Sequence, residues 1–355
     1  MMQISVDLNR IKKVSFVKRL KNHFYYRFRL SNYPVIKVYN GYGNQQHLVV
    51  FGHILNLSSM PRKTYRKDFL TNFFSMLRLF MVRIYPGAKV KLEWGGVTYE
   101  TQSEDDGFFR FEWSPGKTLQ PGKHQVKINL LDGESVVIAK AIGHIYVPDV
   151  YKYAIISDID DTFLISHSSN LQKRLYVLLT KNAHSRKPFE GVINHYKLLA
   201  TAGMKTGATN PFFYVSSSEW NLYEFLIDFS RKHELPEGVF LLSQLKKLKQ
   251  VLKTGQGKHA TKFMRIVRIV EAFPDQPLIL LGDDSQQDPA IYLSVVEHFP
   301  GKISCVYLRQ AHKKNYANVK QIVEKIEKAG VPCCYFKHSA EAVIHSKKIG
   351  LVTSE

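Results

Sequence analysis

The chain has 355 residues, 45% of them hydrophobic and 23% charged, which excludes a disordered or fibrous protein and suits about two globular domains. No stretch reaches the roughly 18 uncharged apolar residues of a membrane-spanning helix, and the opening residues lack the apolar run of a secretory signal. We therefore expect no membrane-spanning segment. The three cysteines, Cys305, Cys333 and Cys334, form no disulfide framework or zinc pattern and favour a reducing compartment.

Positive charge is concentrated near the N-terminus. The net charge of the chain is +20, and residues 1–92 contain 17 Lys or Arg and 2 Asp, a net charge of +15. Such an excess attracts polyanions, whether anionic lipid, nucleic acid or phosphorylated substrates. We expect peripheral membrane contact through residues 1–92, with nucleic acid not excluded. The alternative is that the excess only keeps the protein soluble.

Residues 1–148 are predicted to form a basic segment followed by a β-sandwich domain. Apolar residues at helical spacing predict a helix from Phe69 to Ile84, which either packs on its own domain or lies on a lipid surface. From residue 88 to residue 147, short alternating runs separated by turn signals predict an antiparallel β-sandwich. This pattern is typical of a binding or docking domain.

The pattern changes after Pro148, and residues 149–355 are predicted to form an α/β domain. Short, continuous apolar runs alternate with helical patterns, which indicates a parallel sheet covered on both faces. The runs are residues 153–157, 212–216, 239–242, 278–282, 303–308 and 332–336. In such sheets ligands bind outside the carboxyl ends of the strands.

Two acidic clusters follow the first and fourth of these strands. They are Asp158, Asp160 and Asp161 in one cluster, and Asp283, Asp284 and Asp288 in the other. Because the carboxyl ends of parallel strands share one edge of the sheet, the two clusters predict a site with hard oxygen ligands that suits Mg²⁺. Either cluster alone is also compatible with a solvated loop or a helix cap.

Two further features lie between the acidic clusters. The second strand ends in Ser216, Ser217 and Ser218 ahead of a helical pattern, where hydroxyl and backbone N–H groups can bind a phosphate. Lys262 begins the helical pattern before the fourth strand, from which an ammonium group can reach the same edge. Separately, the serines also suit an N-cap and the lysine a solvated helix face.

The combination of DxDxT, a strand-end serine, a helix lysine and GDDxxxD resembles the haloacid dehalogenase superfamily of phosphatases. The segments SDIDDT, FYVSSSEWNLYEFL and FPDQPLILLGDDSQQDPAIY look like the catalytic domain of the actin-patch-associated phosphatidate phosphatase family. The resemblance covers residues 148–312 and extends weakly to the preceding strands. It implies a haloacid-dehalogenase-like Rossmannoid parallel sheet preceded by an antiparallel β-sandwich domain.

The resemblance also implies roles for individual residues. Asp158 would be the nucleophile that forms an aspartyl-phosphate, and Asp160 the general acid and base. Thr162 completes this motif, and Ser216 and Lys262 would hold the phosphoryl oxygens. Mg²⁺ would bind Asp158, Asp160 through its backbone carbonyl, and Asp283, while Asp284 and Asp288 would complete or orient the metal shell.

The chain departs from the family pattern in two places, at Glu219 and at His259 to Lys262. Lys258 therefore remains an alternative to Lys262. Ser217 likewise remains an alternative to Ser216.

These features predict a Mg²⁺-dependent phosphatidate phosphatase that produces diacylglycerol and phosphate. We expect it to be cytoplasmic, with peripheral membrane contact. One alternative is a phosphomonoesterase of the same mechanism that acts on a soluble or macromolecular phosphoester, and another is a non-catalytic adaptor that binds membranes or polyanions. The sequence does not indicate an oligomeric state.

Overall fold

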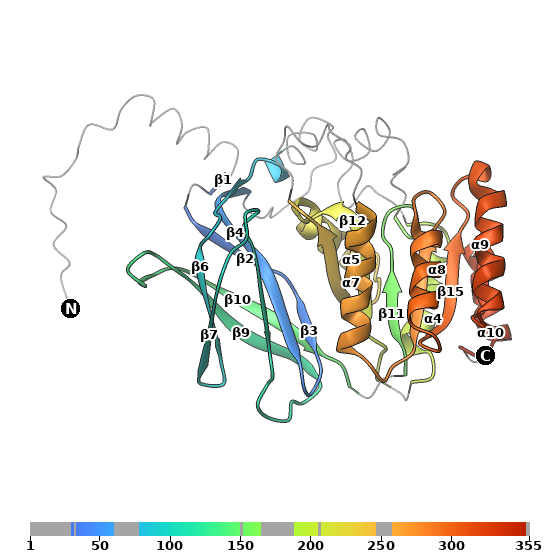
Figure 1. The fold of residues 1–355 in the computed structure, drawn as a ribbon, viewed down its shortest axis with the longest axis horizontal. Helices are drawn as coiled ribbons and strands as arrows, with labels where there is room; N and C mark the ends of the chain where they lie inside the picture. The colour runs from blue at the N-terminus through green and yellow to red at the C-terminus, as the bar shows by residue number, and fades with distance from the viewer. Residues whose placement is uncertain are drawn as a thin grey trace, which may run out of the picture.

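The computed structural model describes residues 30–31, 33–59, 78–149, 152–164, 188–204, 207–245 and 258–352. Within these ranges the chain forms two sheets that lie side by side, with the N-terminal strands in blue to green and the later elements, from β11 on, in light green to red (Figure 1). None of the helices in these ranges is long and apolar enough to span a bilayer.

The later part of the chain forms a six-stranded parallel sheet in the order β13-β12-β11-β14-β15-β16. Its strands are β11 (Ala154–Ser157), β12 (Phe212–Glu219), β13 (Gly238–Ser243), β14 (Leu278–Asp283), β15 (Ile303–Arg309) and β16 (Cys333–Phe336). Each strand contains one of the predicted apolar runs. These runs do not alternate because helices cover both faces of the sheet. The prediction of an α/β fold with a parallel sheet is confirmed.

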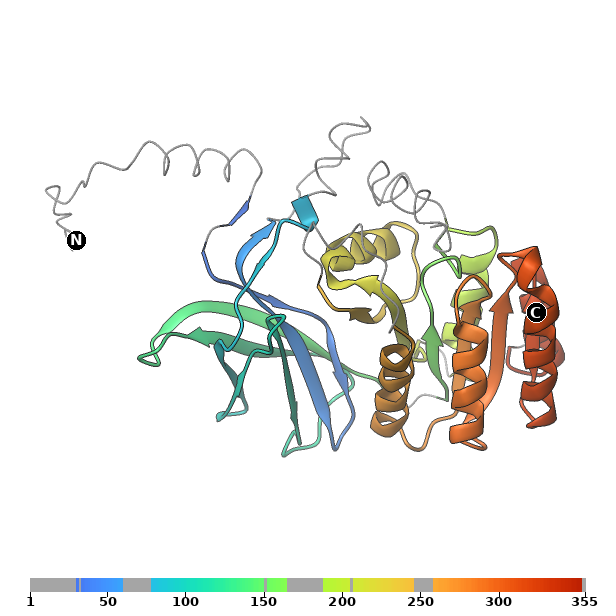
Figure 2. The same ribbon diagram turned by 45° about the horizontal axis from the view of Figure 1, so that its top comes forward.

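Helices connect these strands on both faces of the sheet. Helices α7 (Lys258–Ala272), α8 (Asp288–His298) and α9 (Tyr316–Lys328) stand side by side on one face, as both views show (Figures 1 and 2). The remaining helical elements are α4 (Val192–Thr201), η2 (Trp220–Leu222), α5 (Tyr223–Lys232), η3 (Lys313–Asn315) and α10 (Ser339–Lys348). Strand order runs outward from β11 in both directions, so the carboxyl end of β11 lies at the topological switch point where ligands bind.

The N-terminal part forms a ten-stranded sheet along the path β1-β4-β3-β10-β9-β6-β7, with β2, β5 and β8 also paired to β4. Its strands are β1 (Leu30–Ser31), β2 (Val35–Val38), β3 (Gly41–Gly43), β4 (Leu48–Ser59), β5 (Arg83–Ile84), β6 (Lys89–Trp94), β7 (Val97–Gln102), β8 (Phe108–Trp113), β9 (Gly122–Leu131) and β10 (Val137–Val147). All pairings are antiparallel except that of β3 with β10. Residues from β2, β4, β6, β8, β9 and β10 enclose one apolar core.

The sequence pattern predicts the first strand at residue 88, but this sheet begins well before that residue. Strand β4 is buried almost continuously from Leu48 to Leu55, so it lacks the alternation that marks a half-exposed strand. One side of β4 faces the core of its own sheet, through residues such as Val50 and Ile54. The other side, with Val49 and Phe51, joins the core of the parallel sheet.

The predicted helix from Phe69 to Ile84 is wrong at its C-terminal end, and residues 69–77 lie outside the described residues. Of the residues in this predicted helix that the structure describes, only Arg78 and Leu79 are helical. Arg83 and Ile84 form β5 and pair with Leu57 and Leu55 of β4. Pairing with a long neighbouring strand thus outweighs the local helical spacing at this end.

The N-terminal sheet, besides its own core, contributes side chains to the apolar core of the parallel sheet. The ring of Tyr39 stacks on that of Trp220 with centroids 4.0 Å apart, and Tyr42 meets Phe213 edge to face at 5.4 Å. The backbone N–H of Asn40 donates to the Tyr223 hydroxyl at 3.0 Å. The predicted division into domains 1–148 and 149–355 stays a prediction, but the side chains at the boundary form a continuous contact.

Candidate active site

Asp158 lies directly after β11 at the centre of the parallel sheet. Its backbone N–H donates to the carbonyl of Leu281 at 2.8 Å, so the neighbouring strand β14 fixes its position. The residue is 1% exposed. An almost fully buried carboxylate is costly unless other groups compensate its charge.

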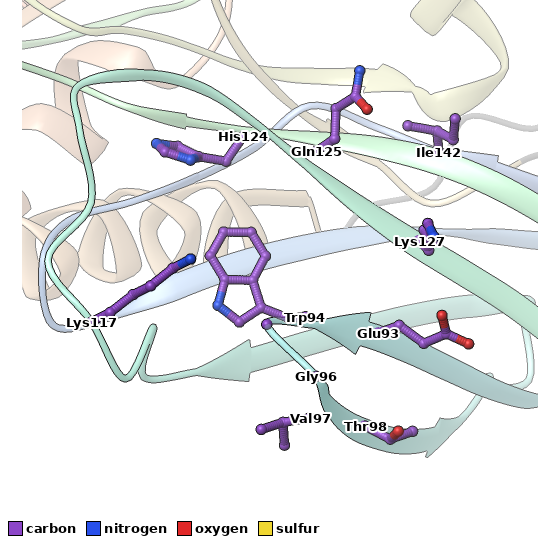
Figure 3. Close-up of a pocket in the computed structure, with 11 residues that line it drawn as sticks. Glu93, Trp94, Gly96, Val97, Thr98, Lys117, His124, Gln125, Lys127 and Ile142 are labelled. Atoms are coloured by element: carbon purple, nitrogen blue, oxygen red, sulfur yellow. The ribbon is translucent and has the colours of Figure 1, made fainter.

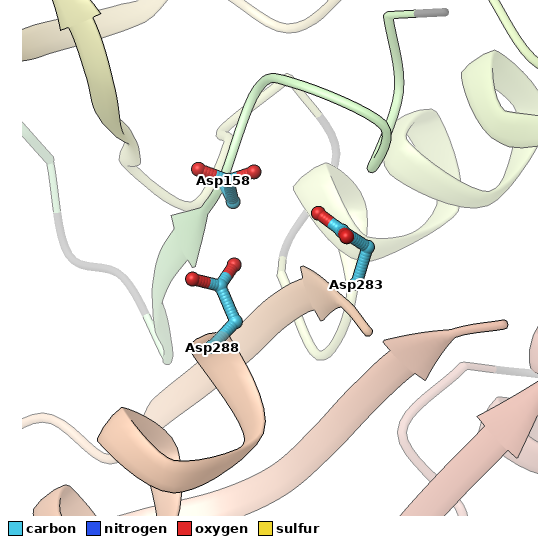
Figure 4. A group of neighbouring side chains, drawn as sticks. All are labelled: Asp158, Asp283 and Asp288. Carbon is cyan, nitrogen blue, oxygen red and sulfur yellow. The ribbon is translucent and has the colours of Figure 1, made fainter. Parts of the chain in front are cut away.

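Two more carboxylates approach Asp158 from β14 and α8 (Figure 4). Asp283 ends β14 and Asp288 begins α8, and oxygen atoms of the three residues lie within 4.8 Å of one another. A Cβ atom at Gly282 would lie 2.8 Å from Oδ2 of Asp288, so a glycine is needed for α8 to approach this closely. Asp158, Asp283 and Asp288, called the acid group below, therefore converge from separate elements.

Lys262 places one ammonium group inside this cluster. It lies in the second turn of α7, and its Nζ donates to Oδ1 of Asp158 at 2.7 Å and to Oδ1 of Asp288. The lysine side chain is 4% exposed, and those of its two partners are 2% exposed. One positive charge faces three carboxyl groups, which leaves negative charge uncompensated if all of them ionise.

Burial and mutual repulsion change the pKa values of these groups. Burial raises the pKa of Asp158 to about 7, against the opposing effect of Lys262, and Asp288 and Asp160 raise it further. Burial, followed by repulsion from Asp288 and Asp158, also holds the pKa of Asp283 well above its ordinary value. Burial alone would lower the pKa of Lys262, but Asp158 and Asp288 outweigh it and raise that pKa. The site therefore favours an additional cation.

The acid group fits a hard divalent cation such as Mg²⁺. Carboxylate oxygens are the ligands that Mg²⁺ prefers. Within the part of the chain that the structure describes, Oδ2 of Asp288 is buried without a hydrogen-bond partner. Such an atom is costly to bury, and a bound cation would compensate it. Asp158, Asp283 and Asp288 are thus the residues that could hold the metal.

Asp160 is paired with serine hydroxyls rather than with the acid group. Its Oδ2 accepts hydrogen bonds from the hydroxyls of Ser216, at 3.2 Å, and Ser218. The Ser218 backbone N–H donates to the Ser216 hydroxyl at 2.8 Å. Because side chains alternate along β12, Ser216 and Ser218 share one side of the strand and Ser217 lies on the other.

Thr162 links the two acidic turns. Its hydroxyl lies 3.2 Å from Oδ2 of Asp158 and 3.1 Å from Oδ2 of Asp283, so it can donate to either carboxylate. The preceding residue, Asp161, has a backbone φ of 60°, a left-handed conformation that costs about 1 kcal/mol for a residue other than glycine. Contacts around the 158–162 loop must maintain this shape.

Asp284 points away from the acid group, although the sequence suggested it as a metal ligand. One oxygen accepts the backbone N–H groups of Ala311 and His312 at 2.7 and 2.9 Å, and the other accepts the hydroxyl of Tyr335 at 2.6 Å. These contacts fix the segment after β15. Asp284 is therefore absent from the ligand set that we propose below.

The two remaining alternatives have different structural settings. Lys258 is the first residue of α7, and its side chain lies outside the described residues. Ser217 is half-buried, whereas Ser216 is fully buried against Asp160. The geometry thus brings Lys262 and Ser216 to the site.

Sequence reasoning missed two residues at the site, Arg309 and Tyr335, and it named Ser218 only as part of the serine run, without its contact to Asp160. The pairing of Ser218 with Ser216 follows from the alternation of a strand and could have been predicted. Arg309 and Tyr335 reach the acidic turns from β15 and β16, respectively. No local pattern marks these two, because their partners lie far away in the sequence.

A cavity of about 590 Å³ lies in the N-terminal sheet rather than at the acid group. Its lining includes Trp94, His124, Lys117, Lys127 and Glu93 (Figure 3). These residues come from the end of β6, from β9 and from the segment before β9. The metal-suited cluster found among the described residues is elsewhere, so this cavity is not the candidate active site.

Comparison with known families confirms the resemblance inferred from the motifs. Residues 153–310 match the family model described as phosphatidate phosphatase APP1, catalytic domain. The matched stretch includes the acid group, Lys262, the serine pair and Arg309. Tyr335 and all elements from η3 onward lie beyond it.

Similarity to individual proteins is weaker. An uncharacterized protein of Schizosaccharomyces pombe (strain 972 / ATCC 24843) is 23% identical over 234 residues, or 64% of this chain and 37% of that protein. The chain thus spans little more than a third of that relative's length. Among solved structures, a carbohydrate acetylesterase from Xanthomonas citri aligns over 89% of this chain and 75% of its own, with 9% identity and a TM-score of 0.32. An ice-binding adhesin of an Antarctic bacterium aligns over 34% of this chain and 25% of its own, with 13% identity and a TM-score of 0.20. TM-scores this low carry no argument about fold or function.

Proposed function

We propose that this chain is a Mg²⁺-dependent phosphatidate phosphatase, a phosphoric monoester hydrolase that releases diacylglycerol and inorganic phosphate. The observation that carries the proposal is the buried acid group bridged by Lys262, which lies inside the stretch that matches the phosphatidate phosphatase model. A match to that family implies a phosphatase. Lipid specificity, metal identity and mechanism are the further content of the proposal.

In this proposal Asp158 is the nucleophile. Its carboxylate attacks phosphorus, and the bond between phosphorus and the glycerol oxygen breaks, which leaves an aspartyl-phosphate and an alkoxide. Lys262 stabilises the ionised form of Asp158 through its contact with Oδ1. Mg²⁺, when held by the carboxylates of the acid group, would supply positive charge that reduces the repulsion of the anionic phosphate by the anionic nucleophile. Asp158, Asp283 and Asp288 are the proposed ligand set.

Asp160 is the proposed general acid and base. It protonates the glycerol alkoxide and then takes a proton from the water that attacks the aspartyl-phosphate, so that phosphate leaves and Asp158 is regenerated. The hydroxyls of Ser216 and Ser218 both bond Oδ2 of Asp160, which orients the carboxyl group and leaves Oδ1 to carry the proton. In this proposal Ser216 and Lys262 also contact the phosphoryl oxygens.

We also propose the assignment of the parallel sheet to the haloacid-dehalogenase-like class. Its support is the sequence DIDDT after a central strand, together with the acid-bearing end of β14. The catalytic domain would then comprise residues 149–355, preceded by a domain of residues 1–148.

Cytoplasmic location with peripheral membrane contact through the basic residues 1–92 is part of the proposal. Most of this segment's basic side chains belong to residues 1–29 and 60–77, outside the described residues. Vesicles containing phosphatidate should bind the full chain in low salt and release it as salt rises. A variant with Lys12, Lys13, Lys18 and Arg19 replaced by glutamine should bind less. Equal binding at all salt concentrations would contradict the electrostatic contact.

Phosphate release from phosphatidate tests the enzymatic proposal. The full chain is assayed on phosphatidate in phosphatidylcholine vesicles and on soluble phosphomonoesters, each with Mg²⁺ and with a chelator. We expect Mg²⁺-dependent release with a preference for phosphatidate. Preference for soluble esters would remove the lipid assignment and favour the alternative phosphomonoesterase. If no ester releases phosphate and vesicle binding is retained, the result would favour the alternative of a non-catalytic adaptor.

A further inference from the structure

Arg309 is a buried cation that the proposed chemistry does not use. It is the last residue of β15, where its backbone pairs with Asp283 on one side and Phe336 on the other. The side chain extends from this position beneath the 158–162 loop and is 3% exposed. Arginine is almost never buried to this extent without specific partners.

Hydrogen bonds connect the guanidinium group to two distant segments. Nε donates to the backbone carbonyl of Thr162 at 2.9 Å. On the other side, Nη2 donates to the Ser339 hydroxyl at 2.7 Å and Nη1 to the carbonyl of Lys337 at 3.4 Å. The planar guanidinium therefore joins the 158–162 loop to the start of α10.

Two aromatic rings fix the plane of the same group. Cζ of Arg309 lies 4.5 Å from the centroid of the Phe189 ring and 4.9 Å from that of Phe336. Phe189 is itself tied to the loop, because its backbone N–H donates to the carbonyl of Phe163 at 3.1 Å. A lysine at position 309 could not reproduce this arrangement, since an ammonium group lacks both the planar face and the fork of donors.

The loop that Arg309 holds needs such support. Asp161 is in the left-handed conformation, and the Thr162 hydroxyl must stay within reach of both Asp158 and Asp283. A strained backbone persists only where its surroundings determine it. The hydrogen bond from Arg309 to the Thr162 carbonyl acts on the same residue that links the two acidic turns.

We propose that Arg309 is a positioning residue that holds the 158–162 loop in its active shape by anchoring it to β16 and α10. The anchoring partners, Phe336 to Ser339, lie outside the stretch that matches the phosphatase family. The catalytic unit accordingly extends at least to the start of α10. The Arg309 guanidinium acts through Thr162: its hydrogen bonds described above go to Thr162, Lys337 and Ser339, not to the side chains of the acid group. In the proposed mechanism it does not touch the substrate.

The test compares Arg309→Met, Arg309→Lys and Ser339→Ala in the full chain, with Arg231→Met as the control. Arg231 lies on α5 with its side chain 77% exposed, so its loss removes an arginine without removing a buried contact. Each variant is assayed for kcat and KM on a soluble phosphomonoester and on phosphatidate, for Mg²⁺ affinity by calorimetry, and for its thermal midpoint. The kinetic part rests on the proposed function, whereas Mg²⁺ affinity does not.

We expect Arg309→Met to lower kcat about 10- to 100-fold on both substrates and to weaken Mg²⁺ binding about tenfold, as for other residues that orient metal ligands. KM should change less than about threefold, because no substrate contact is lost. Arg309→Lys should recover only part of kcat. Ser339→Ala, which removes one acceptor and keeps the aromatic contacts, should show a smaller decrease in the same direction.

A structural role alone would lower the thermal midpoint but leave kcat per folded molecule and Mg²⁺ affinity unchanged, and that result would overturn the proposal. If Arg309→Met does not fold, unchanged kcat and Mg²⁺ affinity in both Arg309→Lys and Ser339→Ala would overturn it equally. Should the wild-type chain bind Mg²⁺ without phosphatase activity, the proposed function fails. The Arg309 inference then stands or falls on Mg²⁺ affinity.

Discussion

The parallel sheet buries charged residues at its carboxyl edge, whereas the N-terminal sheet keeps charged side chains such as Lys89 and Lys127 on its solvent face. The buried residues are Asp158, Asp283, Asp288 and Lys262, each at most 3% exposed as a whole residue. His53, a buried titratable group in the N-terminal sheet, is kept neutral because burial lowers its pKa to about 3. Burying several charges in one place opposes folding. Stability therefore does not explain why charges are buried at this edge of the parallel sheet, and this is the edge to which we assign the proposed chemistry.

Asparagine in place of Asp158 should have the largest effect. Because the nucleophile is lost, we expect phosphate release to fall by about 10⁴-fold or more, with the fold retained. Glu93→Gln, in the cavity of the N-terminal sheet, should leave the rate unchanged. Steady-state assays on phosphatidate check both. If Glu93→Gln were the more damaging change, the chemistry would have been assigned to the wrong sheet.

Loss of Lys262 should affect both activity and stability. Lys262→Met leaves Asp158 and Asp288 without their shared cation, so we expect turnover to fall about 10²- to 10³-fold and stability to fall by about 3 kcal/mol in chelator. Chemical denaturation measures the stability. Lys197→Met breaks an exposed pair with Glu234 and should change stability little. Equal losses from the two variants would contradict the distinction between buried and exposed charge.

The shared core predicts that the two sheets unfold together. Trp220→Ala removes the ring that stacks on Tyr39 and should lower stability by about 3 kcal/mol. Denaturation followed by fluorescence and by circular dichroism should still show one coincident transition. Two separated transitions in the wild-type chain would show instead that each sheet is an independent folding unit.

Asp288 and Asp284 should differ in their effect on metal binding. Asp288→Asn should weaken Mg²⁺ binding about tenfold, because it removes a member of the acid group. Asp284→Asn should change the affinity less than about threefold, since the Asp284 carboxylate bonds the 311–312 segment and Tyr335. Calorimetric titration provides the comparison. A greater loss in Asp284→Asn would return Asp284 to the ligand set.

The smallest predicted effect concerns pH. The pKa of Asp158 is about 7 in the folded chain and 3.8 ordinarily, so between these values the folded state holds a proton that the unfolded state releases. This contribution to stability is present below pH 3.8 and is lost as pH rises through 7. In chelator, the gain in thermal midpoint of Asp158→Asn over wild type should therefore grow from pH 5 to pH 8. A gain independent of pH would refute the shift.

The sequence predicts the site as far as local pattern allows. The two apolar runs that lead into Asp158 and Asp283 are sufficient to predict that these carboxylates meet, because parallel strands bring their carboxyl ends to one edge of the sheet. The direction of Asp284 could not be predicted, since it depends on Tyr335 and the turn after β15. Arg309 gave no signal for the same reason.

The N-terminal region was less predictable for two physical reasons. Strand β4 is buried on both sides, so it does not alternate, and the short strand β5 depends on pairing with it. Because β4 is buried on both sides, the sequence pattern also gives no sign of the contact between the two sheets. A pattern of single-strand alternation cannot distinguish a strand that serves two cores from a helix or a coil.

The stacking of Tyr39 on Trp220 has a practical consequence for handling the protein. A chain nicked once between β10 and β11 should remain associated as two pieces, because the aromatic contact does not depend on the covalent link. Conversely, a fragment expressed without residues 33–59 would present the bare faces of Trp220 and Phe213 to water and tend to self-associate. A fragment made for crystallisation or screening of the later residues should therefore keep residues 33–59 or be mixed with them as a separate chain.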